Sequence, residues 1–216
     1  MRSMRSAPLA SASATEAVEA VRPEAADLLY CLAAAFLPPP AELTGRAWCH
    51  ALAVDLDELG AELELDAAAA VRALRQMAAT PAADEPWLVE FSRLFLVPPV
   101  AVTLNTGIYL EGGLGGASAQ MMTQCYAAAG FAPREDFHDL PDHVAIQLEF
   151  VAVLLERAAG GDADAEAMAA EFVDGFVRHW VEPLRLACER AADRNRAASV
   201  YASLAAFTRA ALDALV

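Results

Sequence analysis

Apolar residues recur at intervals of three and four along most of this chain, a spacing typical of amphipathic helices. The first such run begins after Pro23, includes Leu29 and Tyr30, and ends at the three prolines of 38–40. The same pattern predicts further helices at 42–59, 66–77, 84–97, 118–129, 140–159, 165–192 with a break near Pro183, and 196–215.

Local end signals refine these predictions. Gly60 is expected to end the second helix, and Asp66 and Asp84 are expected to cap the next two. The segment Leu140-Pro141-Asp142 is expected to open the helix that runs to about Ala159.

The chain has neither an alternating strand pattern nor a repeat of fixed period, so we predict an all-α fold: a single helical domain of about eight to ten helices. Residues 1–20 carry too little bulky apolar surface to fold and are expected to form a disordered tail. The helical domain would then cover 21–216, with an N-terminal layer at about 21–97 and a C-terminal layer at 118–216. The connection 98–117 contains two prolines and five glycines and shows no helical period, and a loop of this length is usually functional.

Charge narrows the choice of partners. The formal net charge is −15, with 15 basic and 30 acidic residues, which argues against binding to nucleic acid or to an anionic membrane surface. No apolar run is long enough to predict a membrane helix, and no export signal opens the sequence. The four cysteines lie far apart and form no disulfide-like or metal-binding motif, so a reducing cytoplasm fits best.

The segment His138–His143 holds two of the four histidines together with Asp139 and Asp142. Imidazole and carboxylate groups bind zinc, iron or manganese, so one alternative is a metal-dependent enzyme centred on these four side chains. The other interpretation is helix capping, because a carboxylate at position 142 in a first helical turn would stabilise the exposed N–H groups there.

The helix predicted to begin at Leu140 also presents a candidate recognition surface. His143, Gln147 and Phe150 share one face of the predicted helix, and Glu149 lies seven residues after Asp142, almost beneath it. Most of the aromatic residues between positions 87 and 150 have the spacing of core residues, and a minority of them could line a groove.

Nothing in the sequence forms a nucleophile elbow, a phosphate-binding loop or another catalytic constellation, so neither an enzymatic activity nor a cofactor is predicted.

The segment Leu140–Phe150, LPDHVAIQLEF, resembles the PDHxxxELEF signature of the TorD/DmsD/NarJ-like chaperones for molybdoenzyme maturation. Four further segments resemble this family in the same order: Glu90–Phe95 with Pro98, the Tyr109 segment, Cys125–Phe131 and, loosely, His179-Trp180. The resemblance thus covers residues 87 to 180. Two departures stand out, since Gln147 replaces the usual Glu, and Thr106-Gly107-Ile108-Tyr109 replaces the commoner E-S-V-Y.

The resemblance implies a TorD-like helical bundle that acts as a cytoplasmic chaperone. Its partner would be the signal peptide, often a twin-arginine signal, and the apo form of a molybdopterin oxidoreductase catalytic subunit, held until the cofactor is inserted. Some relatives form domain-swapped dimers, so the chain is expected to be a monomer or a swapped dimer with a hinge at 134–140. The structural alternative is a helical adaptor for an amphipathic partner helix. The peptide-binding residues expected from this resemblance are Trp87, Phe91, Tyr109, Glu111, Tyr126, Asp142, His143, Gln147, Glu149 and Phe150.

Overall fold

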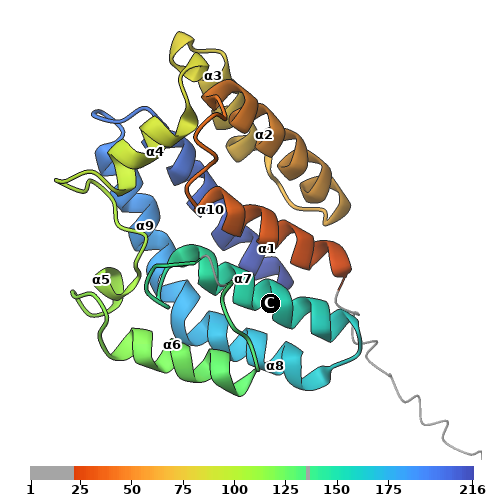
Figure 1. Cartoon of the computed structure of the whole chain (residues 1–216). Helices are drawn as coiled ribbons and strands as arrows, with labels where there is room; N and C mark the ends of the chain where they lie inside the picture. Colours follow the sequence, from red (N-terminus) through yellow and green to blue (C-terminus); the bar gives the residue numbers. More distant parts are fainter. Residues whose placement is uncertain (1–21, 135–136) are drawn as a thin grey trace, which may run out of the picture.

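The computed structural model describes residues 22–134 and 137–216. The expected tail at 1–20 and residues 135 and 136 of the expected hinge lie outside this range. The described residues form helices joined by loops, with no strand beyond two isolated bridges, which confirms the all-α prediction (Figure 1).

The N-terminal half contains four α-helices and one 3₁₀ turn. These elements are α1 (Pro23–Ala35), α2 (Gly45–Glu62), α3 (Ala68–Ala78), the 3₁₀ turn η1 (Pro81–Asp84) and α4 (Trp87–Phe95). The C-terminal half contains α5 (Gly107–Leu110), α6 (Ala117–Ala128), α7 (Val144–Ala159), α8 (Ala163–Phe172), the π-helical turn η2 (Val173–Val177), α9 (Arg178–Ala191) and α10 (Ala197–Leu215).

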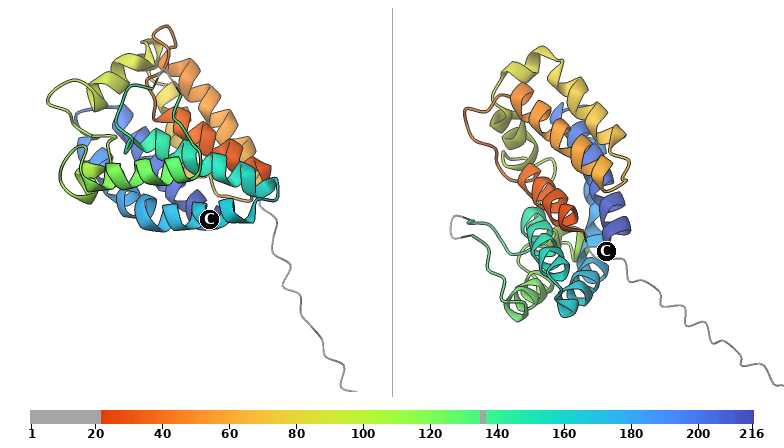
Figure 2. Two further views of the ribbon diagram at one scale, coloured as in Figure 1. Left: turned by 60° about the horizontal axis from the view of Figure 1, so that its bottom comes forward. Right: turned by 90° about the vertical axis from the view of Figure 1, so that its right-hand side faces the viewer.

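The two halves of the chain pack into each other. Helix α1 lies along α7, and α10 packs against both α9 and α3, so helices far apart in sequence lie side by side (Figure 2). One continuous cluster of buried side chains extends from Ala25 to Leu212. The layers expected at 21–97 and 118–216 therefore share a core.

Tyr201 of α10 is the centre of one aromatic cluster in that core. Its ring contacts Phe36, Trp48, Trp87, Phe91 and Phe95. The Trp87 indole N–H donates to the Tyr201 hydroxyl at 3.2 Å, so this buried polar pair is satisfied. These contacts join α4 to α10.

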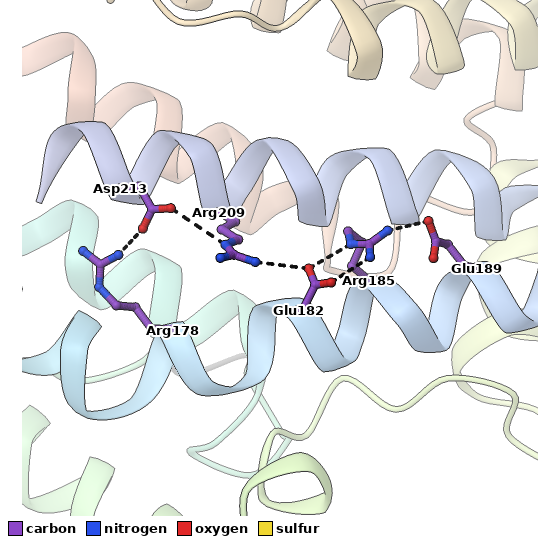
Figure 3. Close-up of polar contacts among 6 residues, drawn as sticks. All are labelled: Arg178, Glu182, Arg185, Glu189, Arg209 and Asp213. Carbon is purple, nitrogen blue, oxygen red and sulfur yellow. Dashed lines mark hydrogen bonds and ion pairs between the residues drawn. The ribbon is translucent and has the colours of Figure 1, made fainter.

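Charged side chains link α9 and α10 along their solvent side (Figure 3). Glu182 pairs with Arg185 at 2.7 Å and with Arg209 at 3.4 Å, and Arg178 bridges to Asp213. A row of alternating charges therefore covers this face.

Two predicted end signals in the first half are wrong. Helix α2 runs through Gly60 to Glu62, and the chain turns at Glu64, which has a φ of 59°. A Cβ on Gly60 would lie 3.0 Å from Ala67 Cβ, so this glycine lets the returning chain pack closely. Asp84 does not cap α4; it lies in η1 and pairs with Arg46 at 2.8 Å.

Three features of the second half also differ from the prediction. The connection 98–117 contains the short helix α5, and α7 begins at Val144 instead of at Leu140. Pro183 lies inside α9, and the irregular turn of this region is η2, which includes Gly175. In the described part of the chain, no helix is long and apolar enough to cross a membrane.

Candidate functional site

A cavity of about 390 Å³ lies where the end of α1, the end of α4 and the start of α7 meet the connections between them. Its wall combines apolar, polar and charged side chains: Leu37, Pro38, Phe91, Phe95, Leu96, Thr103, Leu104, Asn105, Arg134, Phe137, His138, Asp139, His143, Ile146 and Glu149. The volume is in the range of small-ligand sites, so it can accept a few side chains of a larger partner.

Backbone pairing holds the 98–117 connection against the start of α7. Asn105 and His143 form an antiparallel bridge, flanked by Thr106 N–H donating to Asp142 O at 3.0 Å and Val144 N–H donating to Leu104 O at 2.8 Å. This pairing joins residues about forty positions apart, so the helical period could not indicate it. It is also the reason why α7 starts late, because Pro141 and Asp142 form a turn and His143 is extended.

Asp142 is buried beside this bridge. Its carboxylate accepts the Gly107 N–H at 2.8 Å, and the Asn105 amide lies at 3.5 Å. The expectation that Asp142 occupies the first turn of the helix is therefore wrong: it lies before the cap and ties α5 to the start of α7.

Gln147 is buried one turn further along α7, and both the nitrogen and the oxygen of its side-chain amide form hydrogen bonds. Its Nε2 donates to Thr106 Oγ1 at 2.9 Å and to Asp142 O at 2.8 Å, while its Oε1 accepts the Trp180 indole N–H at 2.8 Å. A carboxylate at this position could only accept hydrogen bonds. The two departures from the family pattern, Thr106 and Gln147, are thus hydrogen-bonded to each other.

His143 caps α7. Its Nδ1 accepts the Ala145 N–H at 3.1 Å, so the neutral ring carries its proton on Nε2. Burial lowers the pKa of His143, against the opposing effect of Asp139 and Asp142. His143 was expected within the first turn; it is the N-cap instead, and it lines the cavity.

Glu111 caps a different helix. Its carboxylate accepts the backbone N–H groups of Ala117 and Ser118 at 3.0 and 3.2 Å and the Ser118 hydroxyl at 2.6 Å. The Ser118 hydroxyl is the main cause of the lowered pKa of Glu111. Three donors from the start of α6 therefore already occupy this carboxylate.

The expected aromatic residues lie mostly in the core. Trp87, Tyr126 and Phe150 are buried and do not line the cavity, whereas Phe91 forms part of its wall. Tyr109 is half-buried, and its hydroxyl donates to Thr103 O at 2.8 Å, which holds the connection in place.

Of the ten expected site residues, the structure brings three to the cavity: Phe91, His143 and Glu149. The sequence pattern did not single out Leu37, Leu96, Asn105 or Ile146 as site residues. Leu96 and Asn105 lie in the uncharged run 94–110, which is the one feature of the sequence that could have pointed to them. A local pattern does not reveal, however, which loop residues face a cavity.

Carboxylates follow the contact between α1 and α7 away from the cavity. The Tyr30 hydroxyl donates to Glu156 Oε2 at 3.1 Å. Burial, the bond to Glu156 and the nearby charges of Glu149 and Asp27 raise the pKa of Tyr30 to about 12. We call this line of residues, Asp27, Tyr30, Glu149 and Glu156, the acidic seam.

The described part of the chain contains no cluster of side chains that would support the metal-centred alternative. Within residues 22–134 and 137–216, no three His, Cys, Asp or Glu side chains form a group that could hold a metal ion. Asp139 Oδ1 accepts the Leu140 N–H at 2.6 Å and the Asn105 amide at 2.9 Å, and the neighbouring Asp142 and His143 are engaged as described above. These side chains organise the start of α7.

Comparison with known proteins gives two matches. A family model described as nitrate reductase delta subunit matches residues 60–185, more than half of the chain. A crystal structure from Archaeoglobus fulgidus, assigned as a redox enzyme maturation protein, aligns with a TM-score of 0.52 at 17% sequence identity. The alignment covers 85% of this chain and 91% of that one, which establishes a shared fold. No curated protein matches the sequence.

Proposed function

Because this chain belongs to the nitrate reductase delta subunit family, of NarJ/TorD-type chaperones, we propose that it serves as a chaperone in molybdoenzyme maturation. More specifically, it binds the N-terminal signal region of the apo catalytic subunit, a twin-arginine signal, until the cofactor is inserted. It does so in the cytoplasm and without catalysing a reaction of its own.

The cavity is the observation that carries this proposal. Its floor includes Phe91, Phe95 and Ile146, which are apolar, while Asp139 and Glu149 bring carboxylates to its wall. A twin-arginine signal has a basic segment followed by an apolar one, so its chemistry complements both parts.

The positions of the expected residues support a division of roles among them. We assign direct contact with the leader to Phe91, His143 and Glu149, which line the cavity. We assign packing and hydrogen-bonding roles in the surrounding elements to the other seven, which do not line the cavity: Trp87, Tyr109, Glu111, Tyr126, Asp142, Gln147 and Phe150.

Apolar contact must supply most of the affinity. A micromolar complex needs about 8 kcal/mol net, and exposed ion pairs contribute only about 0 to 1 kcal/mol each. Taken as a sphere, a cavity of 390 Å³ has a wall of roughly 260 Å². At about 25 cal/mol per Å² of apolar surface, even a wholly apolar wall would give only about 6 to 7 kcal/mol before the entropy of ordering the peptide is subtracted. The polar and charged side chains of the wall lower that upper limit. The leader therefore contacts apolar surface outside the cavity as well.

Calorimetry with a synthetic leader peptide tests the function. The probe carries an Arg-Arg pair followed by a leucine-rich core, and we expect it to bind with micromolar affinity. Glu149→Gln should weaken binding, whereas Glu58→Gln, a change at an exposed α2 residue that does not line the cavity, should not.

Replacing both peptide arginines with glutamine separates the chaperone from the adaptor alternative. A chaperone that reads the arginines loses affinity, and an adaptor for an amphipathic helix does not. Absence of binding to every leader of the cell's molybdoenzymes would contradict the proposal.

A further inference from the structure

Apolar side chains continue out of the cavity along the loop after α4. Leu96, Val97 and Val100 are 50%, 53% and 47% exposed. Leu96 also lines the cavity, so this loop extends the cavity wall into solvent. We call these three residues the apolar lip.

The acidic seam leaves the cavity in another direction. Leu37, just after α1, and Ile146 of α7 both line the cavity, while Tyr30 of α1 bonds Glu156 of α7, so the two helices run in opposite directions. Glu156 lies seven residues beyond Glu149, about 10 Å further along α7. In Figure 1, α1 and α7 extend together to the right, whereas the loop after α4 projects to the left.

The two exits therefore differ in chemistry. Residues 94–110, which include the apolar lip, contain no charged side chain. Glu149 and Glu156 bring negative charge to the other exit, and Asp27 lies close enough to Tyr30 to act on its hydroxyl. Of the two exits, the seam is the one that attracts a basic segment, whereas the lip is the one on which an apolar segment can bury surface.

The cavity is too small to hold a whole leader. A micromolar complex needs about 8 kcal/mol net and at least about 4 kcal/mol more to offset association, which at about 25 cal/mol per Å² corresponds to roughly 500 Å² of apolar burial. The cavity wall of roughly 260 Å², part of which is polar, is at most about half of that area. A leucine-rich core of ten helical residues would be about 15 Å long, enough to cross the cavity and reach a neighbouring surface.

We infer that the leader binds in one direction, with its arginine pair on the acidic seam beside Glu156 and its apolar core running through the cavity onto Leu96, Val97 and Val100. This inference rests on the proposed function and adds the path and polarity of the bound peptide.

Photo-crosslinking tests the direction. The probe is the synthetic Arg-Arg leader with p-benzoylphenylalanine placed either next to the arginine pair or in the leucine-rich core. We expect the first probe to label residues around Tyr30 on α1 and Glu156 on α7, and the second to label 96–100. The reverse pattern, or labelling of both regions by both probes, would overturn the proposed direction.

Substitutions give an independent measurement. Val97 and Val100 are exposed, so the double change Val97→Asn with Val100→Asn should leave the fold intact and weaken leader binding about tenfold. Val54→Asn is the matched control, because Val54 is 37% exposed on α2 and does not line the cavity, and it should leave affinity unchanged.

A double-mutant cycle tests the proposed contact between the arginine pair and Glu156 of the acidic seam. Glu156→Gln should weaken binding of the Arg-Arg peptide several-fold and have no effect on the peptide with glutamines in place of the arginines. Equal effects on both peptides, or unchanged affinity in the double valine variant, would refute the proposed path while leaving leader binding itself intact. If wild-type protein binds no leader at all, the proposed function fails and this inference fails with it.

Discussion

Gln147 Nε2 donates to Thr106 Oγ1 across 2.9 Å, in a buried position where the connection after α4 meets α7. In the family signature that this sequence resembles, glutamate is the usual residue at both positions. Two carboxylates at this distance would repel each other, and burial would disfavour charging them. The amide and hydroxyl instead form a neutral cluster that also includes Asp142 O and the Trp180 indole.

Gln147→Glu should therefore destabilise the fold by about 2 to 4 kcal/mol at pH 7, because a buried carboxylate replaces a group that donates twice. Denaturant unfolding measures the loss. The difference from the wild type should narrow as pH falls, since a protonated carboxyl can donate one hydrogen bond. Gln76→Glu, on an exposed position of α3, is the matched control and should change stability little. A Gln147→Glu variant as stable as the wild type would contradict the role of the amide.

The helical periods and the glycines and prolines between them predicted most of the fold. The helix expected at 118–129 is observed at Ala117–Ala128, and the one expected to end near Ala159 ends there. Both depend on local spacing, which the sequence displays directly.

The local pattern could not predict backbone pairing between residues that are far apart in the sequence. The bridge between Asn105 and His143 delays the start of α7 and buries Asp142. Asp142 therefore lies before the cap and His143 is the N-cap, whereas the sequence predicted both in the first helical turn. The sequence also contained no sign that the apolar lip is exposed. Valine is usually a core residue, and only the fold leaves Val97 and Val100 in contact with solvent.

His143 predicts a pH dependence of stability. Burial holds the pKa of His143 below its ordinary value of 6.5, so the unfolded chain takes up this proton first as pH falls. The contribution of His143 to the free energy of unfolding should be fully present above about pH 6.5, fall as the pH drops below it, and level off below the pKa of the folded state.

Unfolding free energies measured between pH 5 and 8 for the wild type and His143→Asn check this. Asparagine can keep the cap but does not titrate, so the part of the slope due to His143 should vanish. His50→Asn changes an exposed histidine on α2, which takes no part in the cap of α7, and should leave that slope in place. An unchanged slope in His143→Asn would exclude this residue as its cause.

Gly107 is predicted to tolerate no side chain. A Cβ there would lie 2.6 Å from Gly113 O and 2.9 Å from Asp142 Oδ2, and the first of these atoms is backbone that cannot turn aside. Gly107→Ala should cost about 1 to 3 kcal/mol through displacement of α5. Gly113→Ala is the control, because a Cβ at that position would meet no heavy atom within 4 Å. Equal melting temperatures for the two variants would show that the close approach is not needed.

The charge row between α9 and α10 predicts a salt-dependent contribution to stability. Glu182 contacts Arg185 and Arg209, and bonds to Arg185 are the main cause of its lowered pKa. Its carboxylate links the two helices, as the Arg178–Asp213 pair also does, so Glu182→Gln should weaken their packing by about 0.5 to 1 kcal/mol at low ionic strength.

Salt distinguishes this electrostatic effect from a packing effect. Glutamine has nearly the shape of glutamate but loses the charge and one of the two acceptor oxygens. Salt weakens only the charge-dependent part, because exposed ion pairs are screened within about 10 Å at 0.1 M salt. The stability difference between Glu182→Gln and the wild type should shrink as salt is added, whereas Glu58→Gln, which forms no ion pair within the described residues, should differ little at any salt concentration. A difference that persists at 1 M salt would mean that Glu182 acts through hydrogen-bond geometry at the helix interface, because the Debye length there is only about 3 Å.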